Sequence, residues 1–280
     1  AHSHMMWTGD QHVDWSVDDG LPSVIPATLS LAMSGYGIAH SDVGGYTTIM
    51  HMKRSKELLL RWEEMNVFSP LFRSHEGNQP VNNVQFDDDE ELLAHLRKCG
   101  KMHVALKPYL KKLVKEQSSD GTPVMRPLFY HYDEKPAYTE KTEYLLGRDL
   151  LVAPVYEEGA KKRQVYLPKD VGVHLFDGTE YTGGQILVDA PIGKPPVFVR
   201  KGSPDYEALM KAGANYASSP GRIMIHALDP VFIVEKIACS RIDVVVPIEE
   251  ILDQTITGVK GIGGFETRGK FRWAMPRPLL

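Results

Sequence analysis

The sequence contains little cysteine: Cys99 and Cys239 are its two cysteines in 280 residues. Two cysteines cannot form a disulfide framework, and neither lies in the spacing of a zinc site. The glycine-rich stretch 258–269 follows no phosphate-loop spacing. We therefore expect no metal and no cofactor. A reducing compartment is compatible with this composition, and we favour the cytoplasm.

Long apolar runs are also absent. No stretch approaches the run of about 18 apolar residues that marks a membrane-spanning helix, and no signal peptide is recognisable. The formal net charge of −4 gives no indication of nucleic acid or of an anionic membrane as a partner, and we expect neither. Residues 2–5 resemble a cloning scar, but we interpret them as part of the strand that leads to Trp7.

The remaining composition is ordinary for a globular chain, with 42% hydrophobic and 24% charged residues, so the information lies in motifs. Three polar clusters each follow an apolar run, and the hydrophobic pattern predicts helices between them. The clusters are at 7–11, 40–46 and 73–78, the strands at 3–7, 36–40 and 67–72, and the helices at 21–34 and 52–65.

In a (β/α) barrel, catalytic groups project from the C-terminal ends of the strands. Any one cluster is also compatible with ordinary turn chemistry, because Gly-Asp and Ser-Asp pairs favour turns. Three clusters at regular strand–helix spacing favour the barrel. The adjacent Gly44 and Gly45 would let the backbone approach a ligand closely.

The pattern changes near residue 120. Before it, a long helix opens at the acidic residues 87–91 and carries a buried stripe. His95 and His103 lie on or near that stripe, which favours structural roles. From 122 to 202, short apolar runs broken by Gly and Pro predict an all-β sandwich. Residues 218–280 remain unassigned, with a candidate strand at 243–246 and a candidate helix at 248–257.

Four motifs in order carry a resemblance: Trp-Thr-Gly-Asp-Gln, Ser-Asp-Val-Gly-Gly-Tyr, Lys-Glu-Leu-Leu-Leu-Arg-Trp and Arg-Ser-His. Together they resemble glycoside hydrolase family 31, and most of all its sulfoquinovosidases, over residues 1 to about 212. The resemblance implies an α/β plus β fold. The C-terminal part of a TIM (β/α)8 barrel would occupy 1–120, and a β-sandwich domain would occupy 121–217. It also implies a retaining α-glycosidase with a carbohydrate substrate.

The resemblance assigns Asp10 as the catalytic acid/base. This carboxyl would protonate the leaving glycosidic oxygen and later deprotonate water. The role demands a raised pKa, which an apolar wall and a second carboxylate supply. Trp7 would form part of that wall.

Four further residues are candidates for substrate binding, and the resemblance assigns roles to two of them, His75 and Tyr46. His75 would hydrogen-bond ring hydroxyls, and Tyr46 would help to hold a sulfonate, unless it is a buried aromatic under the barrel mouth. Asp42 either contacts sugar hydroxyls or anchors its loop. Arg73 either faces the substrate or, as we prefer, pairs with a neighbouring carboxylate.

The family's nucleophile and its sulfonate-reading Gln, Arg and Trp lie in motifs with no counterpart in this sequence. An eight-stranded barrel needs roughly 200 residues, and about 120 precede the sandwich here. We therefore expect the C-terminal part of an enzyme, inactive alone, whose open strand edge would allow self-association. The alternatives are an α-glucosidase or α-xylosidase of the same family, or a non-catalytic sugar-binding remnant.

Overall fold

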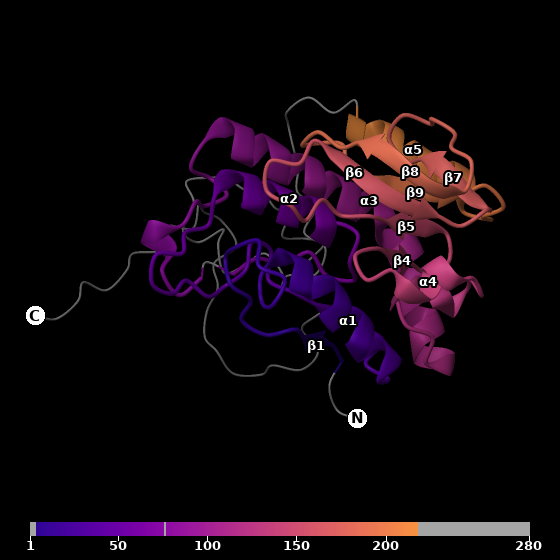
Figure 1. Ribbon diagram of the computed structural model, residues 1–280, viewed down its shortest axis with the longest axis horizontal. Coiled ribbons are helices and arrows are strands. Elements are labelled where there is room, and N and C mark those ends of the chain that lie inside the picture. The colour runs from indigo at the N-terminus through magenta and orange to yellow at the C-terminus, as the bar shows by residue number, and fades with distance from the viewer. Residues whose placement is uncertain (1–3, 76, 218–280) are drawn as a thin grey trace, which may run out of the picture.

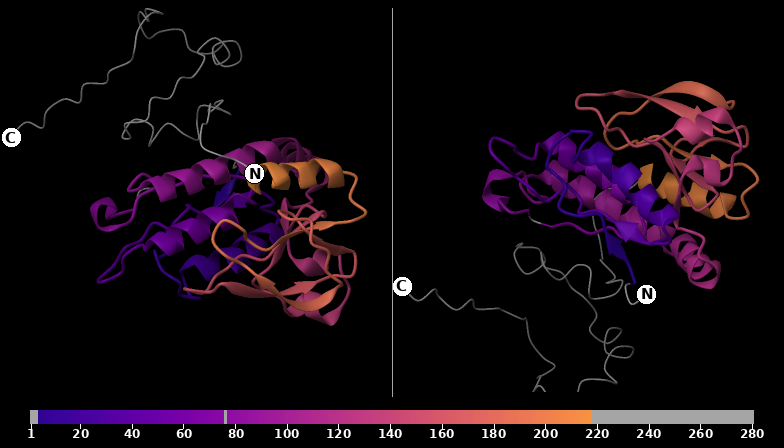
Figure 2. Two further views of the ribbon diagram at one scale, coloured as in Figure 1. Left: turned by 90° about the horizontal axis from the view of Figure 1, so that it is seen from above. Right: turned by 60° about the horizontal axis from the view of Figure 1, so that its bottom comes forward.

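A computed structural model of the chain describes residues 4–75 and 77–217. Helices of the first 120 residues form one part, and the sheets of residues 125–200 lie against it (Figure 1). Figure 2 shows the last described helix, α5 (Tyr206–Ala217), running beside the long helix α3 (Glu90–Asp120). The candidate strand and helix of the tail lie outside the described residues.

The first strand–helix–strand unit forms as predicted. Strands β1 (Met6–Trp7) and β2 (Ala39–His40) pair in parallel, with Trp7 opposite His40. The 3-10 turn η1 (Leu21–Ser23) and helix α1 (Val24–Met33) connect them. The ends of both strands therefore lie side by side, as parallel pairing requires.

The predicted third strand at 67–72 is wrong. Helix α2 (Lys56–Asn66) continues into a turn, because the Val67 and Phe68 N–H groups still donate to carbonyls of the helix. The Ser69 hydroxyl bonds the carbonyls of Asn66 and Leu71, which fixes the bend. A single parallel bridge, Val43 to Ser74, remains of the expected pairing. The apolar side chains of this turn are buried in the helical core instead of alternating as a strand would.

Two helices dominate the first part, and each begins at a side-chain cap. Ser55 accepts from the Leu58 N–H at the start of α2, and Asp89 accepts from the Leu92 N–H at the start of α3. Gly121 ends α3 with a φ of +83°, which glycine adopts readily. A short 3-10 turn, η2 (Pro80–Asn82), lies between these helices.

Strands form within the predicted stretch 122–202 and make two sheets. The larger sheet has the order β3-β4-β5-β9-β7, with antiparallel neighbours, and the smaller sheet is the antiparallel pair β6-β8. The strands are β3 (Met125–Arg126), β4 (Tyr144–Leu146), β5 (Leu150–Val152), β6 (Lys162–Leu167), β7 (Val171–His174), β8 (Gly184–Asp189) and β9 (Val197–Arg200). The 3-10 turn η3 (Leu128–Tyr130) and helix α4 (Lys135–Thr139) precede β4.

The central strands β4, β5 and β9 carry buried apolar or aromatic residues at every position except Arg200, the last residue of β9, because both of their faces are covered. Alternate residues point to opposite faces. Leu145, Leu151 and Phe198 join the core between the two sheets. Their neighbours on the same strands join the large core shared with α1, α2 and α3: Tyr144, Leu146, Leu150, Val152, Val197 and Val199.

Within the described residues, no helix combines the length and apolarity that crossing a bilayer would require.

A buried carboxyl at the start of β4 makes stability depend on pH. Glu143 is 1% exposed, and its Oε1 accepts from the Tyr166 N–H at 2.9 Å. Its other oxygen has no partner among the described residues. Burial, reinforced by Glu140, raises the pKa of Glu143 from 4.5 to about 8. Since the protonated form is favoured in the fold, Glu143 costs stability as pH rises from 4.5 toward 8.

We predict that Glu143→Gln removes this pH dependence. Urea unfolding of both proteins at pH 5, 6, 7 and 8 measures it. The free energy of unfolding of Glu143→Gln relative to the original should rise by about 1.4 kcal/mol per pH unit at most over this interval. The exposed Glu158→Gln is the control and should show no such slope. Parallel pH curves for the original and Glu143→Gln would contradict the prediction.

Candidate functional site

The loop that follows β2 carries the most buried of the predicted site residues. The Asp42 side chain is 1% exposed, and both of its oxygens are engaged. Oδ1 pairs with the guanidinium of Arg73, and Oδ2 accepts from the Trp7 indole N–H at 3.2 Å. Asp42 thus ties the end of β1 to the loop at 73–75. The preferred interpretation of Arg73, a carboxylate partner, matches this geometry.

Burial raises the pKa of Asp42, and the positive charge of Arg73 opposes that rise. His40, His75 and the Trp7 hydrogen bond act in the same direction as Arg73. The ion pair is therefore what compensates the cost of a desolvated carboxylate at this position.

Tyr46 and His75 form a second contact in the same region. Their rings meet edge to face, with centroids 4.7 Å apart and planes at 90°. The His75 Nδ1 atom is buried and has no hydrogen-bond partner among the described residues.

Asp10 lies at the end of β1 and is exposed. Its backbone carbonyl accepts from the Thr47 hydroxyl at 2.8 Å, which links it to the loop that carries Tyr46. Its carboxylate makes no hydrogen bond or ion pair to the other five predicted residues in the part of the chain that the structure describes. The structure thus joins Trp7, Asp42 and Arg73 directly and Tyr46 to His75, with Asp10 held beside them through backbone contacts.

Sequence reasoning missed the residues that hold this loop in place. The Trp62 indole N–H donates to the Ser41 hydroxyl at 3.3 Å, and the Asn66 amide donates to the Ser41 carbonyl at 2.9 Å. Both come from α2, and both are buried. His40 is buried too, and burial lowers its pKa. The signal for Trp62 was present in the recognised helix motif, but no spacing rule connects it to Ser41.

The two glycines of the loop allow a close approach of the backbone, as expected. The groups that they approach belong to the protein and not to a ligand. Gly44 and Gly45 have φ values of +89° and +72°. A Cβ on Gly44 would lie 2.7 Å from the Arg54 Nη1, and one on Gly45 would lie 2.9 Å from the His12 carbonyl oxygen. The expected close approach is therefore to Arg54 and to the backbone of residues 11–12.

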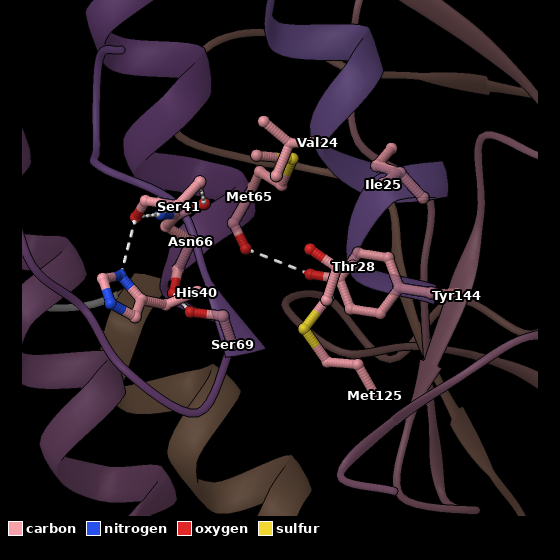
Figure 3. Close-up of a pocket in the computed structure, with 10 residues that line it drawn as sticks. All are labelled: Val24, Ile25, Thr28, His40, Ser41, Met65, Asn66, Ser69, Met125 and Tyr144. Carbon is pink, nitrogen blue, oxygen red and sulfur yellow. Dashed lines mark hydrogen bonds between the residues drawn. The ribbon is translucent and has the colours of Figure 1, made fainter. Parts of the chain in front are cut away.

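A small cavity lies behind the loop, and it is too small for a sugar. Figure 3 shows it between α1, the end of α2 and Tyr144, with His40 and Ser41 on one side. Its volume is about 10 Å³, which is near the minimum for one water molecule. A substrate would have to bind on the outer side of the loop, where Trp7 is 45% exposed.

Parallel strands whose ends gather a carboxylate, a histidine and aromatic rings define the class of fold, part of a (β/α) barrel. Comparison with known families agrees. Residues 1–113 match the family 31 glycosyl hydrolase TIM-barrel domain, and residues 121–203 match the family 31 C-terminal domain. The chain belongs to glycoside hydrolase family 31 through these two domains. Residues 201–276 match a different family, YabG peptidase U57.

Similar proteins include sulfoquinovosidases. The chain is 58% identical to the sulfoquinovosidase of Escherichia coli K12 over 203 residues, which are 72% of this chain and 30% of that protein. It is 47% identical to that of Agrobacterium fabrum over 206 residues, 72% of this chain and 31% of that protein. The chain thus spans about 30% of the length of these relatives.

A solved structure is also similar. It is the family 31 sulfoquinovosidase from E. rectale in complex with the aza-sugar inhibitor IFGSQ. The TM-score is 0.74 at 47% identity, and the match covers 76% of this chain and 32% of that one. The predicted fold class, part of a TIM barrel followed by a β domain, is confirmed.

We predict that Arg73→Met destabilises the protein by about 3 kcal/mol at pH 7, because it leaves the buried Asp42 carboxylate without its cation. Loss of the cation raises the pKa of Asp42 further, so the destabilisation shrinks toward pH 5. Urea unfolding at the two pH values measures both effects.

The double variant Arg73→Met/Asp42→Asn should recover part of the lost stability, since it also removes the unpaired charge. The exposed Arg148→Met serves as the control for loss of an arginine. Equal stabilities for Arg73→Met and Arg148→Met would show that the Arg73–Asp42 pair does not matter.

Proposed function

We propose that residues 1–78 contribute the acid/base side of a retaining α-glycoside hydrolase site. Asp10 protonates the glycosidic oxygen and then activates water, in the two-carboxyl mechanism of such enzymes. The observation that carries the proposal is the gathering of Trp7, Asp42, Arg73, Tyr46 and His75 around the ends of β1 and β2. The exposure of Asp10 beside them leaves its carboxyl accessible to a substrate.

Each neighbour has a role in this proposal. His75 bonds a ring hydroxyl through Nε2, because its Nδ1 atom is buried. Tyr46 fixes the His75 ring and contacts the sugar. Asp42 acts as an anchor, because its two oxygens are used by Arg73 and Trp7. Trp7 presents its exposed indole face to the substrate.

The proposed substrate class is α-sulfoquinovosides. The support is the 58% identity to a sulfoquinovosidase and the similarity to a sulfoquinovosidase bound to an aza-sugar inhibitor. The alternative is a neutral α-glucoside or α-xyloside. A neutral sugar needs no cationic contact at its C6 end, so comparing sulfoquinovosides with glucosides separates the two substrates.

We propose also that this chain alone does not complete the site. A retaining mechanism needs a second carboxyl about 5 Å from the first. No motif in the sequence corresponds to the family nucleophile, and two strands, β1 and β2, represent the barrel in the described residues 4–75 and 77–120. General acid catalysis alone contributes about 10²–10⁴-fold, well below the roughly 10⁶-fold minimum typical of enzymes.

The first test compares the purified chain with its Asp10→Asn variant on p-nitrophenyl α-sulfoquinovoside. We expect no release of p-nitrophenol above the variant's level. Turnover that disappears in Asp10→Asn would contradict the incomplete site and would point to a carboxylate such as Asp14 as the missing partner. Calorimetric titration with sulfoquinovose and glucose then tests binding, which His75→Ala should weaken. Heat of binding without turnover is the expected result, and equal binding by the original and His75→Ala would contradict the role of His75.

The second test places this stretch in a complete barrel. The matching 203 residues of the E. coli sulfoquinovosidase are replaced by those of this chain. The chimera should cleave sulfoquinovosides, and Asp10→Asn should lower the rate on alkyl sulfoquinovosides by about 10²–10⁴-fold. The loss should be smaller on the p-nitrophenyl substrate, because p-nitrophenolate leaves without a proton.

Asp18→Asn, an exposed carboxylate of the same loop, is the matched control and should leave the rate unchanged. An active chimera in which Asp10→Asn and Asp18→Asn behave alike would remove Asp10 from the acid/base role.

We further propose that the chain self-associates. The sheet β1-β2 has two strands and therefore open edges, whereas a closed barrel has none. Sedimentation velocity over a hundredfold concentration range should show mass increasing with concentration. A single monomer species throughout would contradict this.

A further inference from the structure

Three side chains of different chemistry meet in the helical core. Glu63 projects from α2, and His95 and Cys99 project from α3, where a separation of four residues places them on one face. The carboxylate, ring-nitrogen and sulfur atoms all lie within 4.8 Å of one another. Glu63 and Cys99 are fully buried, and His95 is 8% exposed.

Three polar atoms of this cluster lack hydrogen-bond partners in the part of the chain that the structure describes. Both carboxylate oxygens of Glu63 and the Nε2 atom of His95 make no hydrogen bond there. The His95 Nε2 and Glu63 Oε2 atoms are 3.7 Å apart, which is too far for a hydrogen bond. Since buried polar atoms are nearly always satisfied, a group that bonds all three residues at once would account for the arrangement.

The surrounding contacts orient the cluster as a ligand set. The His95 ring hydrogen-bonds the backbone of Leu60, which leaves the Nε2 lone pair facing the cluster. Histidines that bind metals commonly donate their other N–H to a backbone carbonyl in this way. From α5, the Tyr216 hydroxyl hydrogen-bonds the Cys99 sulfur, which fixes the orientation of this side chain in the cluster.

The charge balance also favours a cation. The neighbouring Glu64 is already paired with Arg61, whose Nη1 atom lies 2.9 Å from the Glu64 Oε2. Glu63 has no comparable ion pair with an arginine or lysine in the described residues. Arg54 acts on Glu63 electrostatically without a hydrogen bond to it. A divalent cation would neutralise the Glu63 carboxylate and a Cys99 thiolate together.

We propose that Glu63, His95 and Cys99 form a structural zinc site that joins α2 to α3. A sulfur, a nitrogen and an oxygen ligand together suit Zn²⁺, whereas Mg²⁺ and Ca²⁺ prefer oxygen alone. Each residue offers one ligand atom, so the three side chains supply three of the four positions that Zn²⁺ takes. Binding displaces the Cys99 thiol proton to solvent. The site is independent of the proposed hydrolysis, since none of the six candidate site residues belongs to it.

The first experiment measures zinc in the purified chain, and then titrates Zn²⁺ into the chelator-treated protein against a chromophoric competitor. We expect one zinc per chain and a higher midpoint of thermal unfolding with zinc than without it. The proposal would be overturned if the protein took no zinc from the competitor and if zinc left the midpoint of thermal unfolding unchanged.

The second experiment replaces zinc with Co²⁺. Bound cobalt should give the visible bands of a tetrahedral site and a thiolate-to-cobalt charge-transfer band in the near ultraviolet. Both should persist in Cys239→Ser, which changes the chain's other cysteine. This readout does not depend on a core variant that folds. The absence of the thiolate band in the original chain would overturn the proposal.

Variants then locate the ligands. Cys99→Ser should abolish the charge-transfer band, and Glu63→Gln should weaken zinc binding by more than the roughly 10–100-fold typical of second-sphere changes. His103→Gln, a histidine of the same helix outside the cluster, should bind zinc as the original does. A charge-transfer band that survives in folded Cys99→Ser, or zinc affinity unchanged in folded Glu63→Gln, would refute the assignment.

Discussion

Helix α2 is buried along nearly its whole length, and this constraint organises the molecule. Nine of its eleven residues are buried, and four of those nine carry polar side chains: Arg61, Glu63, Glu64 and Asn66. Because a buried polar group is costly without a partner, each one must meet a complementary group. Arg61 donates to the carbonyls of Ala160 and Ala190, and Glu64 accepts from the Gly193 N–H, so two of them bind the sandwich.

The same helix positions the candidate site. Trp62 and Asn66 hold Ser41, and the next residue in the chain is Asp42. The loop is therefore fixed from beneath by α2 and from the side by Arg73 and Trp7. Groups that are held in this way need little reorganisation when a ligand arrives, which is how rigid scaffolds support chemistry carried on loops.

The predictability of each feature depended on how local its cause was. The central sandwich strands were predictable because burial on both faces gives continuous apolar runs. The apolar run at 67–72 gave a wrong strand prediction for a related reason. It is buried as a strand would be, but it forms the end of a helix followed by a turn. A carboxylate partner for Arg73 was expected, but no sequence rule identified it as Asp42 or added the Trp7 hydrogen bond, because Trp7 and Arg73 lie 35 and 31 residues from Asp42. His95 and Cys99 had a visible helical spacing, but Glu63 comes from another helix.

Alternate residues of β4, β5 and β9 pack into two different cores, which makes the two parts of the chain depend on each other. One face of this sheet belongs to the sandwich, and the other face is part of the core around α1, α2 and α3. The larger sheet is therefore a common wall, and neither part has a complete interior of its own. A cut at residue 120 would follow the chain's change of pattern, yet it would expose Tyr144, Leu150 and Val199 to water. The two parts should unfold in one cooperative step, even though the sequence suggests two modules.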